Sequence, residues 1–152
     1  MRLTLHTDYA LRTLIYLGLR PDRRVSIREI AEAYGISENH LVKLVHKLGQ
    51  GGMIETIRGK GGGLRLGRPA AEIGIGDVVR FTEEDLALVD CFQADGRRHC
   101  AITDACRLQL LLHDALDAFM AVLDTRTLAD LLAEPQRGVM TLRLGIPVPS
   151  ES

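Results

Sequence analysis

Large aromatic side chains and long apolar runs are both scarce in this sequence. Phe, Tyr and Trp make up only 4% of the 152 residues, and Trp is absent. A core without many aromatic rings must be built from Leu, Ile, Val and Ala, and this composition favours helices over a sandwich of sheets. We therefore expect a mostly α-helical fold, with room for one small domain and an added oligomerising element.

No segment contains the roughly 18 consecutive apolar residues that a membrane span needs. The first residues lack the continuous apolar stretch of a secretory signal and already carry Asp8 and Arg12. We therefore expect a cytoplasmic protein without a membrane partner. In that reducing compartment, an odd number of cysteines favours metal or redox chemistry over a disulfide framework.

The only cysteines, Cys91, Cys100 and Cys106, follow the pattern C-x8-C-x5-C in a loop rich in charged residues. Cysteines that merely fill a core lie inside apolar runs, so these are better interpreted as ligands. Three thiolates can hold three corners of a tetrahedral zinc ion or an iron-sulfur cluster. The fourth position is then left for a different ligand, which indicates a labile, sensing site.

Charge is divided unevenly along the chain. Residues 1–70 contain 12 Lys and Arg against 6 Asp and Glu, whereas residues 71–152 contain 7 against 14. A basic half can neutralise the phosphates of a nucleic acid while an acidic half stays away from it. The alternative is that the imbalance is a chance variation in the charges on solvent-exposed faces, and the charge count alone does not exclude it.

Periodicity and capping residues predict three helices in the basic half. The first spans Thr7–Leu19, with Thr7 as its N-cap. The second, Ser26–Tyr34, opens with a capping box and is ended by Gly35. Ser37 caps the third helix, which carries its apolar residues on one face. Its outward face is polar and consists of Asn39, His40, Lys43, His46, Lys47 and Gln50.

The turn Tyr34–Ser37 joins the last two helices as in a helix-turn-helix, where the second helix enters the major groove. Met53–Arg58 and Leu64–Arg68 then predict a hairpin around the glycine-rich turn Gly59–Gly63. Backbone N–H groups and a lysine in that turn can contact DNA phosphates, which is the property of a wing. The turn lacks Walker spacing and precedes a strand, so it is not a nucleotide phosphate loop.

A winged helix-turn-helix that reads DNA is favoured over an enzyme fold that merely contains three short helices and a hairpin. Double-stranded DNA is then the expected partner. The residues expected to contact it are Ser26, Arg28, Ser37, Asn39, His40, Lys43, Lys47, Arg58, Lys60, Gly61, Gly62 and Arg65.

A helix expected at Ile75–Glu83 would pack back on the winged domain, so residues 1–83 form the DNA-binding domain and 84–106 the ligand loop.

After Cys106 the apolar residues form a stripe too broad for one small neighbour to cover. A second copy would cover it and give a homodimer with two recognition helices about one DNA turn apart. The alternative is that this helix closes the core of the single chain. Residues 107–133 are thus a long dimerisation helix and a short terminal helix, and 134–152 are expected to form a flexible tail.

The segments MRLTLHTDYALRTLIYLG and ISENHLVKLVHKLGQGGMIETIRGKGGGLRL, together with the cysteine loop, resemble the Rrf-type winged-helix regulators of bacteria over roughly residues 1–133. Within that family, Thr7–Arg12 is similar to the NsrR branch, nitric-oxide-sensing repressors that bind an iron-sulfur cluster through three cysteines. The IscR-like branch has a histidine three residues after the last cysteine, where this chain has Gln109. The first cysteine interval is on the long side for the family, and the second matches it well.

The resemblance implies a 4Fe-4S cluster, or alternatively a 2Fe-2S cluster, held by the three cysteines and by Asp8 of the partner subunit. A carboxylate is a hard ligand for a soft iron-sulfide site, so it should bind weakly and give nitric oxide an entry point. Arg12 could hold the carboxylate through an i, i+4 pair. From the residues alone, Asp8 also fits a first-turn acid that complements the helix dipole.

The function implied is that of a homodimeric transcriptional repressor, which binds operator DNA and releases it when nitric oxide reacts with the cluster. An IscR-like or other redox-sensing cluster regulator is one alternative. A zinc site with His99 is another, although the adjacent Cys100 and His99 rarely point at one metal. A metal-free thiol switch is a third, because exposed thiols oxidise. We expect no enzyme, because neither His99 nor His113 lies in a recognisable nucleophile motif.

Overall fold

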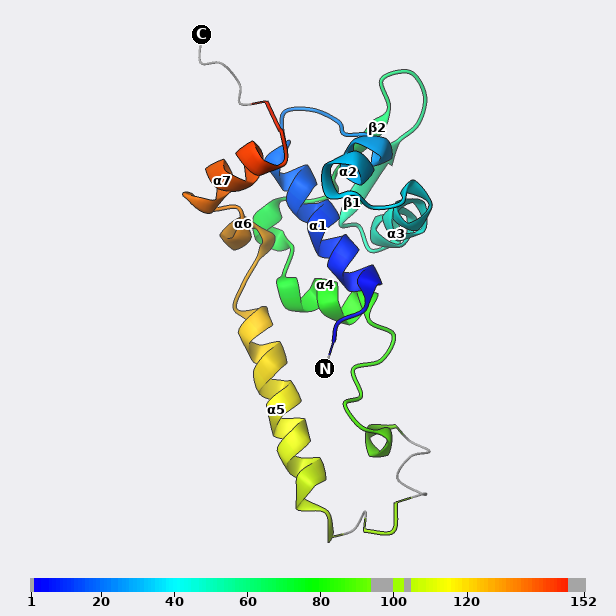
Figure 1. Cartoon of the computed structure of the whole chain (residues 1–152), viewed down its shortest axis with the longest axis vertical. Coiled ribbons are helices and arrows are strands. Elements are labelled where there is room, and N and C mark those ends of the chain that lie inside the picture. Colours follow the sequence, from blue (N-terminus) through cyan, green and yellow to red (C-terminus); the bar gives the residue numbers. More distant parts are fainter. Residues whose placement is uncertain (1, 94–99, 103–104, 148–152) are drawn as a thin grey trace.

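The computed structural model describes residues 2–93, 100–102 and 105–147. Its fold is mostly helical with one small hairpin, as expected (Figure 1). No helix within these described ranges is both long enough and apolar enough to cross a membrane. The elements are α1 (Leu5–Leu19), α2 (Ile27–Tyr34), α3 (Glu38–Gln50), β1 (Ile54–Ile57), β2 (Gly63–Leu66), η1 (Ala70–Glu72), α4 (Ile75–Thr82), η2 (Asp90–Phe92), α5 (Arg107–Asp124), α6 (Leu128–Leu131) and α7 (Gln136–Arg143).

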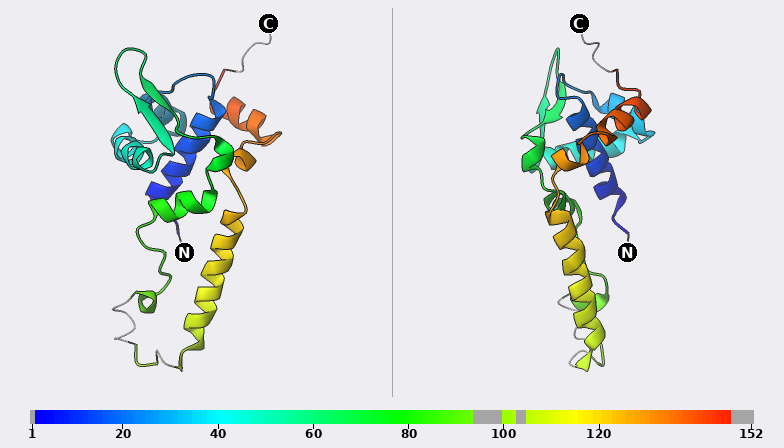
Figure 2. Two further views of the ribbon diagram at one scale, coloured as in Figure 1. Left: turned by 180° about the vertical axis from the view of Figure 1, so that it is seen from behind. Right: turned by 90° about the vertical axis from the view of Figure 1, so that its left-hand side faces the viewer.

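Helix α1 is the centre of the fold, and it contacts α3, β2, α4 and α6 (Figure 1). The helix-turn-helix and the hairpin lie on one side of it, and α6 and α7 lie near its carboxyl end (Figure 2). Its inward side chains Ala10, Leu14 and Leu17 are fully or almost fully buried. The core around them is aliphatic and draws on every neighbouring element, which is the arrangement that the shortage of aromatic residues predicted.

The start of α1 differs from the prediction. The helix begins at Leu5 and its N-cap is Thr4, whose hydroxyl accepts a hydrogen bond from the Thr7 backbone N–H at 3.3 Å. Thr7, expected as the cap, is instead fully buried, and its hydroxyl lies 2.8 Å from the Thr82 hydroxyl. The expected cap was wrong because Thr7 serves a contact between α1 and α4 that no local pattern reveals.

The helix-turn-helix follows its predicted limits. Ser26 caps α2 by accepting a hydrogen bond from the Glu29 backbone N–H at 3.1 Å. The Glu29 side chain does not complete the capping box, because it pairs with Arg23 and accepts a 2.9 Å hydrogen bond from the Tyr16 hydroxyl. Gly35 ends α2 with a φ of 65°, a left-handed conformation that favours glycine.

The hairpin is shorter than its sequence pattern predicted. Strands β1 and β2 are antiparallel, with Ile54 opposite Leu66 and Ile57 opposite Gly63. Val25 adds an isolated bridge to β2 through backbone hydrogen bonds of 2.9 and 2.8 Å with Leu64. This bridge anchors the hairpin to the segment that precedes α2.

Helix α5 extends away from the rest of the molecule (Figures 1 and 2). Only Met120 among its residues is buried, whereas Leu111 and Val122 are 63% and 66% exposed. Its carboxyl end is fixed to α4 by an ion pair between Arg80 and Asp124, with an Nη1–Oδ1 distance of 2.8 Å. The apolar stripe expected for a dimerisation helix is therefore uncovered in the single chain.

The carboxyl-terminal segment corrects another expectation. Residues 134–147 were expected to belong to a flexible tail, but they form α7 and pack against the core. Ile146 is only 6% exposed, and Met140 and Leu144 are partly buried beside it. Pro135 does not break the helix because it lies at the N-cap position, where a missing N–H costs nothing. The remaining residues of the expected tail, 148–152, lie outside the described part of the chain.

Glu83 links the start of α1 to the end of α4. Its carboxylate accepts hydrogen bonds from the backbone N–H and the hydroxyl of Thr4, at 2.8 and 3.0 Å, and from the Thr7 hydroxyl. Burial alone would raise the pKa of this carboxyl, but the hydrogen bonds outweigh burial and leave the pKa below its ordinary value. The ionised form therefore stabilises the fold.

We predict that Glu83→Gln lowers the free energy of unfolding at neutral pH by about 1–2 kcal/mol, the usual effect of losing a charge-assisted hydrogen bond. Since folding lowers the pKa, this stabilisation is present above the pKa of the unfolded carboxyl and disappears as the pH falls through the lower folded pKa. Urea unfolding across the acid range measures it. The exposed neighbour Glu84 provides the control variant Glu84→Gln, and an equal loss in that variant would contradict the prediction.

Candidate functional site

Helix α3 lies on the same side of α1 as the hairpin (Figures 1 and 2). Its exposed face is mostly polar, with Val42 as an apolar exception. Asn39, His40 and Lys43 on this face are exposed, and Ser37 is exposed at its amino end. The opposite face is buried against the core through Leu41, Leu44, Val45 and Leu48. This amphipathic division fixes which side chains α3 can offer to a DNA groove.

His40 also contacts the central helix. Its ring lies over the ring of Tyr9 in α1, with the centroids 6.4 Å apart and the planes inclined by 29°. Tyr9 follows Asp8 directly in the chain. The start of α1 and the amino-terminal half of α3 are therefore in contact, an arrangement that sequence reasoning missed.

Lys47 lies on α3 but away from Lys43. Its ammonium is 5.9 Å from the centroid of the Phe81 ring and 3.5 Å from the carbonyl oxygen of Thr82. The side chain is half-buried and turned towards α4. At the start of α2, Arg28 is exposed and its Nε donates to the Glu32 carboxylate at 2.8 Å.

The hairpin turn exposes Arg58 and Lys60, neither of which has a side-chain partner in the described part of the chain. Gly62 packs so closely that an added Cβ would lie 2.3 Å from the Ile57 carbonyl oxygen, so a larger residue would distort the turn. Arg65 in β2 is paired with Glu55 in β1 at 2.7 Å.

Arg24 is a cation of this surface that the sequence analysis did not identify. Its guanidinium Nη1 donates to the Gly61 carbonyl oxygen at 2.7 Å, which places an exposed positive charge on the turn. Its neighbour Val25 bridges to β2 and so brings Arg24 to the hairpin. Only that tertiary pairing identifies it, because the local sequence looks like an ordinary polar turn.

Two of the three cysteines lie at ordered positions in the loop between α4 and α5. Cys91 is in η2 and Cys106 occupies the N-cap position of α5, and both are half-buried free thiols. Cys100 lies between them and is exposed. Soft thiolates on one loop are a donor set that fits an iron-sulfur cluster or zinc.

The described residues of the single chain do not bring a complete ligand set together. Among the described residues, no three His, Cys, Asp or Glu side chains are grouped closely enough to hold a metal ion. Residues 94–99 and 103–104 of the loop, including His99, lie outside the described residues.

Two residues of α5 hold the η2 turn. The ring of His113 is stacked on Phe92, with centroids 3.9 Å apart and planes inclined by 11°. One turn earlier, Gln109 donates its side-chain N–H to the Cys91 carbonyl oxygen at 3.4 Å. Positions i and i+4 share one face of a helix, so both contacts fix Cys91 against α5. The stack was missed because Phe92 and His113 are separated by the whole loop.

Asp8 and Arg12 form the expected i, i+4 pair on α1. Both guanidinium–carboxylate distances, Nε–Oδ1 and Nη2–Oδ2, are 2.9 Å, so the pair is bidentate. The Arg12 guanidinium also lies 5.8 Å from the centroid of the Tyr34 ring, at the end of α2. The start of α1, which carries Asp8, and the η2 turn, which carries Cys91, are well separated in every view (Figures 1 and 2).

Comparison with known proteins gives a consistent family assignment. The model of the Rrf2 family, described as an iron-dependent transcriptional regulator, matches residues 3–134. A transcriptional regulator named NsrR from Geobacillus kaustophilus is 55% identical over 135 residues, which cover 88% of this chain and 91% of the relative. The NsrR regulator of Bacillus subtilis is 48% identical over 145 residues, 95% of this chain and 99% of the relative.

Solved structures show the same fold. CymR, the global cysteine regulator of B. subtilis, is 28% identical with a TM-score of 0.68, covering 86% of this chain and 95% of that chain. The T. potens IscR structure is 26% identical with a TM-score of 0.67, covering 87% of this chain and 86% of that chain. The curated relatives are transcriptional regulators and not enzymes, which confirms the expectation that this chain is not an enzyme.

The contact between Phe92 and His113 gives a prediction for the reduced, metal-free protein. We expect His113→Ala to release the η2 turn and to speed amide hydrogen exchange in residues 90–93 by roughly fivefold, if the stack contributes about 1 kcal/mol. Exchange followed by mass spectrometry measures this. The adjacent exposed residue supplies the control Asp114→Ala, which should leave exchange in this turn unchanged. Unchanged exchange in His113→Ala would show that α5 does not hold Cys91.

Proposed function

The chain belongs to the Rrf2 family of transcriptional regulators, and we propose that it is a nitric-oxide-responsive repressor of the NsrR type. The observation that carries this proposal is the position of Asp8. Its carboxylate is exposed on α1, remote from its own cysteines, yet linked to the helix-turn-helix through Arg12 and Tyr34. This position suits a ligand that reaches the cysteine loop of a second subunit and reports on that site to the DNA-binding helices.

In this proposal α3 enters the major groove of the operator. Ser37, Asn39, His40 and Lys43 lie near the groove, and Ser26 and Arg28 approach the backbone at the start of α2. The wing contacts phosphates through the side chains of Arg58 and Lys60 and the backbone N–H groups of its glycines. The exposed Arg24 adds a further cation beside Gly61. The remaining candidates of this surface are Lys47, Gly61, Gly62 and Arg65.

Dimer formation through α5 completes the repressor. Three apolar side chains on one face of this helix, Leu108, Leu111 and Val122, are each at least 59% exposed. Burying both copies of this stripe against each other removes it from water, at about 25 cal/mol for each Å² of apolar surface. A two-fold dimer then presents two copies of α3 to a roughly symmetric operator.

Cys91, Cys100 and Cys106 of one subunit, with Asp8 of the partner subunit, would hold a 4Fe-4S cluster. When bound, such a cluster supplies iron that reacts with nitric oxide. Binding of iron by Asp8 would weaken the hydrogen bond that one carboxylate oxygen accepts from Arg12, since both oxygens are engaged in the pair described above. Arg12 can still hold the other oxygen and so orient the carboxylate.

Release of Asp8 restores the bidentate pair and changes the position of Arg12 against Tyr34. Tyr9, next to Asp8, simultaneously carries the change to His40 in α3. Both contacts act on the helix-turn-helix, so the two recognition helices of a dimer lose the spacing that fits the operator. Repression is lifted because operator affinity falls.

The function is tested with protein prepared without oxygen. Wild-type protein should be brown, should contain iron and sulfide, and should bind the operator until nitric oxide is added. Cys91→Ala, Cys100→Ala and Cys106→Ala should lose the cluster, and Asp8→Ala should keep at most a cluster with an altered spectrum and a weaker DNA response. Wild-type affinity and nitric-oxide response in all four variants would overturn the proposal, as would a colourless protein with stoichiometric zinc.

The DNA-binding surface gives a separate prediction. Lys43→Ala should weaken operator binding and reduce the slope of log K against log salt by about 1 for each subunit, because an exposed lysine on this face neutralises a phosphate. Titration of labelled operator at several salt concentrations measures the slope. Lys47→Ala should have a smaller effect because that ammonium is engaged with Phe81 and Thr82. The exposed cation Arg126 in the acidic half supplies the control Arg126→Ala, and an equal loss there would contradict the assigned surface.

A further inference from the structure

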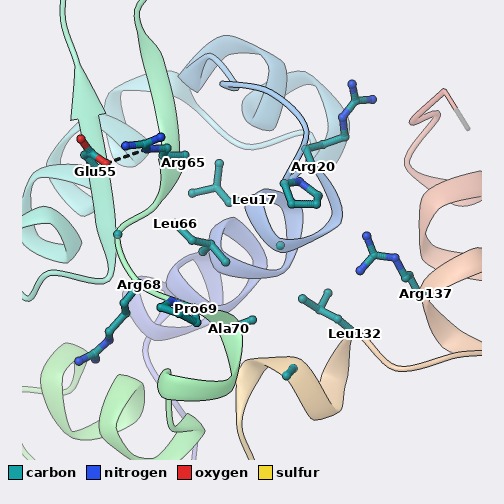
Figure 3. Close-up of a pocket in the computed structure, with 14 residues that line it drawn as sticks. Leu17, Arg20, Glu55, Arg65, Leu66, Arg68, Pro69, Ala70, Leu132 and Arg137 are labelled. Carbon is teal, nitrogen blue, oxygen red and sulfur yellow. Dashed lines mark hydrogen bonds and ion pairs between the residues drawn. The ribbon is translucent and has the colours of Figure 1, made fainter. Parts of the chain in front are cut away.

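A cavity of about 610 Å³ lies at the base of the wing (Figure 3), and no residue of the cysteine loop lines it. It is bounded by the carboxyl end of α1, the hairpin, η1, α6 and α7. Its size is in the range of cavities that bind small molecules. Part of the lining is apolar and consists of Leu17, Leu66, Pro69, Ala70 and Leu132.

The charged lining is predominantly cationic. Arg20, Arg65, Arg68 and Arg137 line the cavity, whereas Glu55 is the only acidic residue among those that border it in the described part of the chain. Glu55 is already paired with Arg65, as Figure 3 shows. The other three arginines therefore have no carboxylate within the cavity lining.

Arg20 is the most unusual of these residues because its side chain is buried with free hydrogen-bonding capacity. The residue is only 9% exposed, and its Nη2 lies 3.2 Å from Asp22 Oδ2. Its Nε and Nη1 are buried without a hydrogen-bond partner in the described part of the chain, and so is Arg68 Nε. Buried donors of this kind are costly unless something accepts their hydrogen bonds.

Arg137 supplies a second guanidinium that is available to a ligand. It extends from α7 towards the carboxyl end of α1 (Figure 3), and its side chain forms no ion pair within the described residues. Arg20 and Arg137 also border an adjoining cavity of about 250 Å³ between α1 and α7. The two arginines thus border both cavities, and the smaller one is also lined by Asp22 and Glu134.

We propose that this cavity binds a small organic carboxylate with an apolar body. Guanidinium groups recognise carboxylates through charge-assisted hydrogen bonds. The apolar lining favours a ligand with a hydrocarbon portion over a fully hydrated anion such as phosphate. The ligand would contact both the wing base and α7, and so would give the protein a chemical input that does not depend on the proposed cluster.

The test uses the full-length protein and three probes in isothermal titration calorimetry. Hexanoate is the matched carboxylate, hexanamide has the same apolar chain without the charge, and inorganic phosphate has the charge without the chain. The proposal predicts that hexanoate binds saturably with a dissociation constant below about 10 mM. Hexanamide and phosphate should have dissociation constants at least tenfold higher. Equal binding of hexanamide, tighter binding of phosphate, or no binding of hexanoate would each overturn it.

Variants locate the site. Arg137→Gln removes a guanidinium that supports no other contact and should weaken hexanoate about tenfold, the usual effect of losing a charged hydrogen bond. Ala129→Phe should fill part of the cavity and reduce binding to a similar extent. Arg143, exposed on the same helix but outside the cavity lining, provides the control Arg143→Gln. Unchanged binding in both Arg137→Gln and Ala129→Phe would place the ligand elsewhere and overturn the proposal, whatever the state of the cysteine loop.

Discussion

The apolar stripe of α5 is the constraint on which the rest of the molecule depends. This helix has a single buried residue and exposes several leucines to water. Soluble monomers rarely expose an apolar patch of this kind, which marks it as an interaction surface. If a second copy covers the stripe, the exposed carboxylate of Asp8 and the distant cysteine loop no longer need to meet within one subunit. The separation of these groups in the single chain is then an expected consequence of sharing the site between two subunits.

In the proposed repressor, helix α1 would connect this shared site to the DNA-binding helices. Its buried face contacts α3, β2, α4 and α6, and its first turns carry Asp8, the half-buried Tyr9 and the exposed Arg12. Arg12 contacts α2 through Tyr34, and Tyr9 contacts α3 through His40. A helix packed this tightly transmits a displacement instead of absorbing it. The α4–α5 junction adds a second connection through the pair of Arg80 and Asp124, in which the guanidinium lowers the pKa of the carboxyl.

Local patterns predicted the helix-turn-helix, the wing and α5, because periodicity, caps and glycine turns are encoded in neighbouring residues. They failed where a contact joins distant segments. Thr7 has the residue type of a cap but is buried, and its hydroxyl contacts Thr82. The prolines near the carboxyl end predicted no helix there, whereas α7 packs against the core through Met140 and is followed by the buried Ile146. The Asp8–Arg12 pair followed from i, i+4 spacing, whereas Arg24 at the wing and the Phe92–His113 stack needed the tertiary structure.

The central claim is that the cofactor site is built from two subunits, and a mixed dimer tests it most directly. One subunit carries Asp8→Ala and the other Cys91→Ala, with different tags so that the mixed species is purified and loaded without oxygen. A site shared across the dimer predicts one site with the wild-type spectrum and nitric-oxide response, made of three cysteines from the first subunit and Asp8 from the second. Both parent homodimers should lack such a site. A mixed dimer that also lacks it would contradict the account.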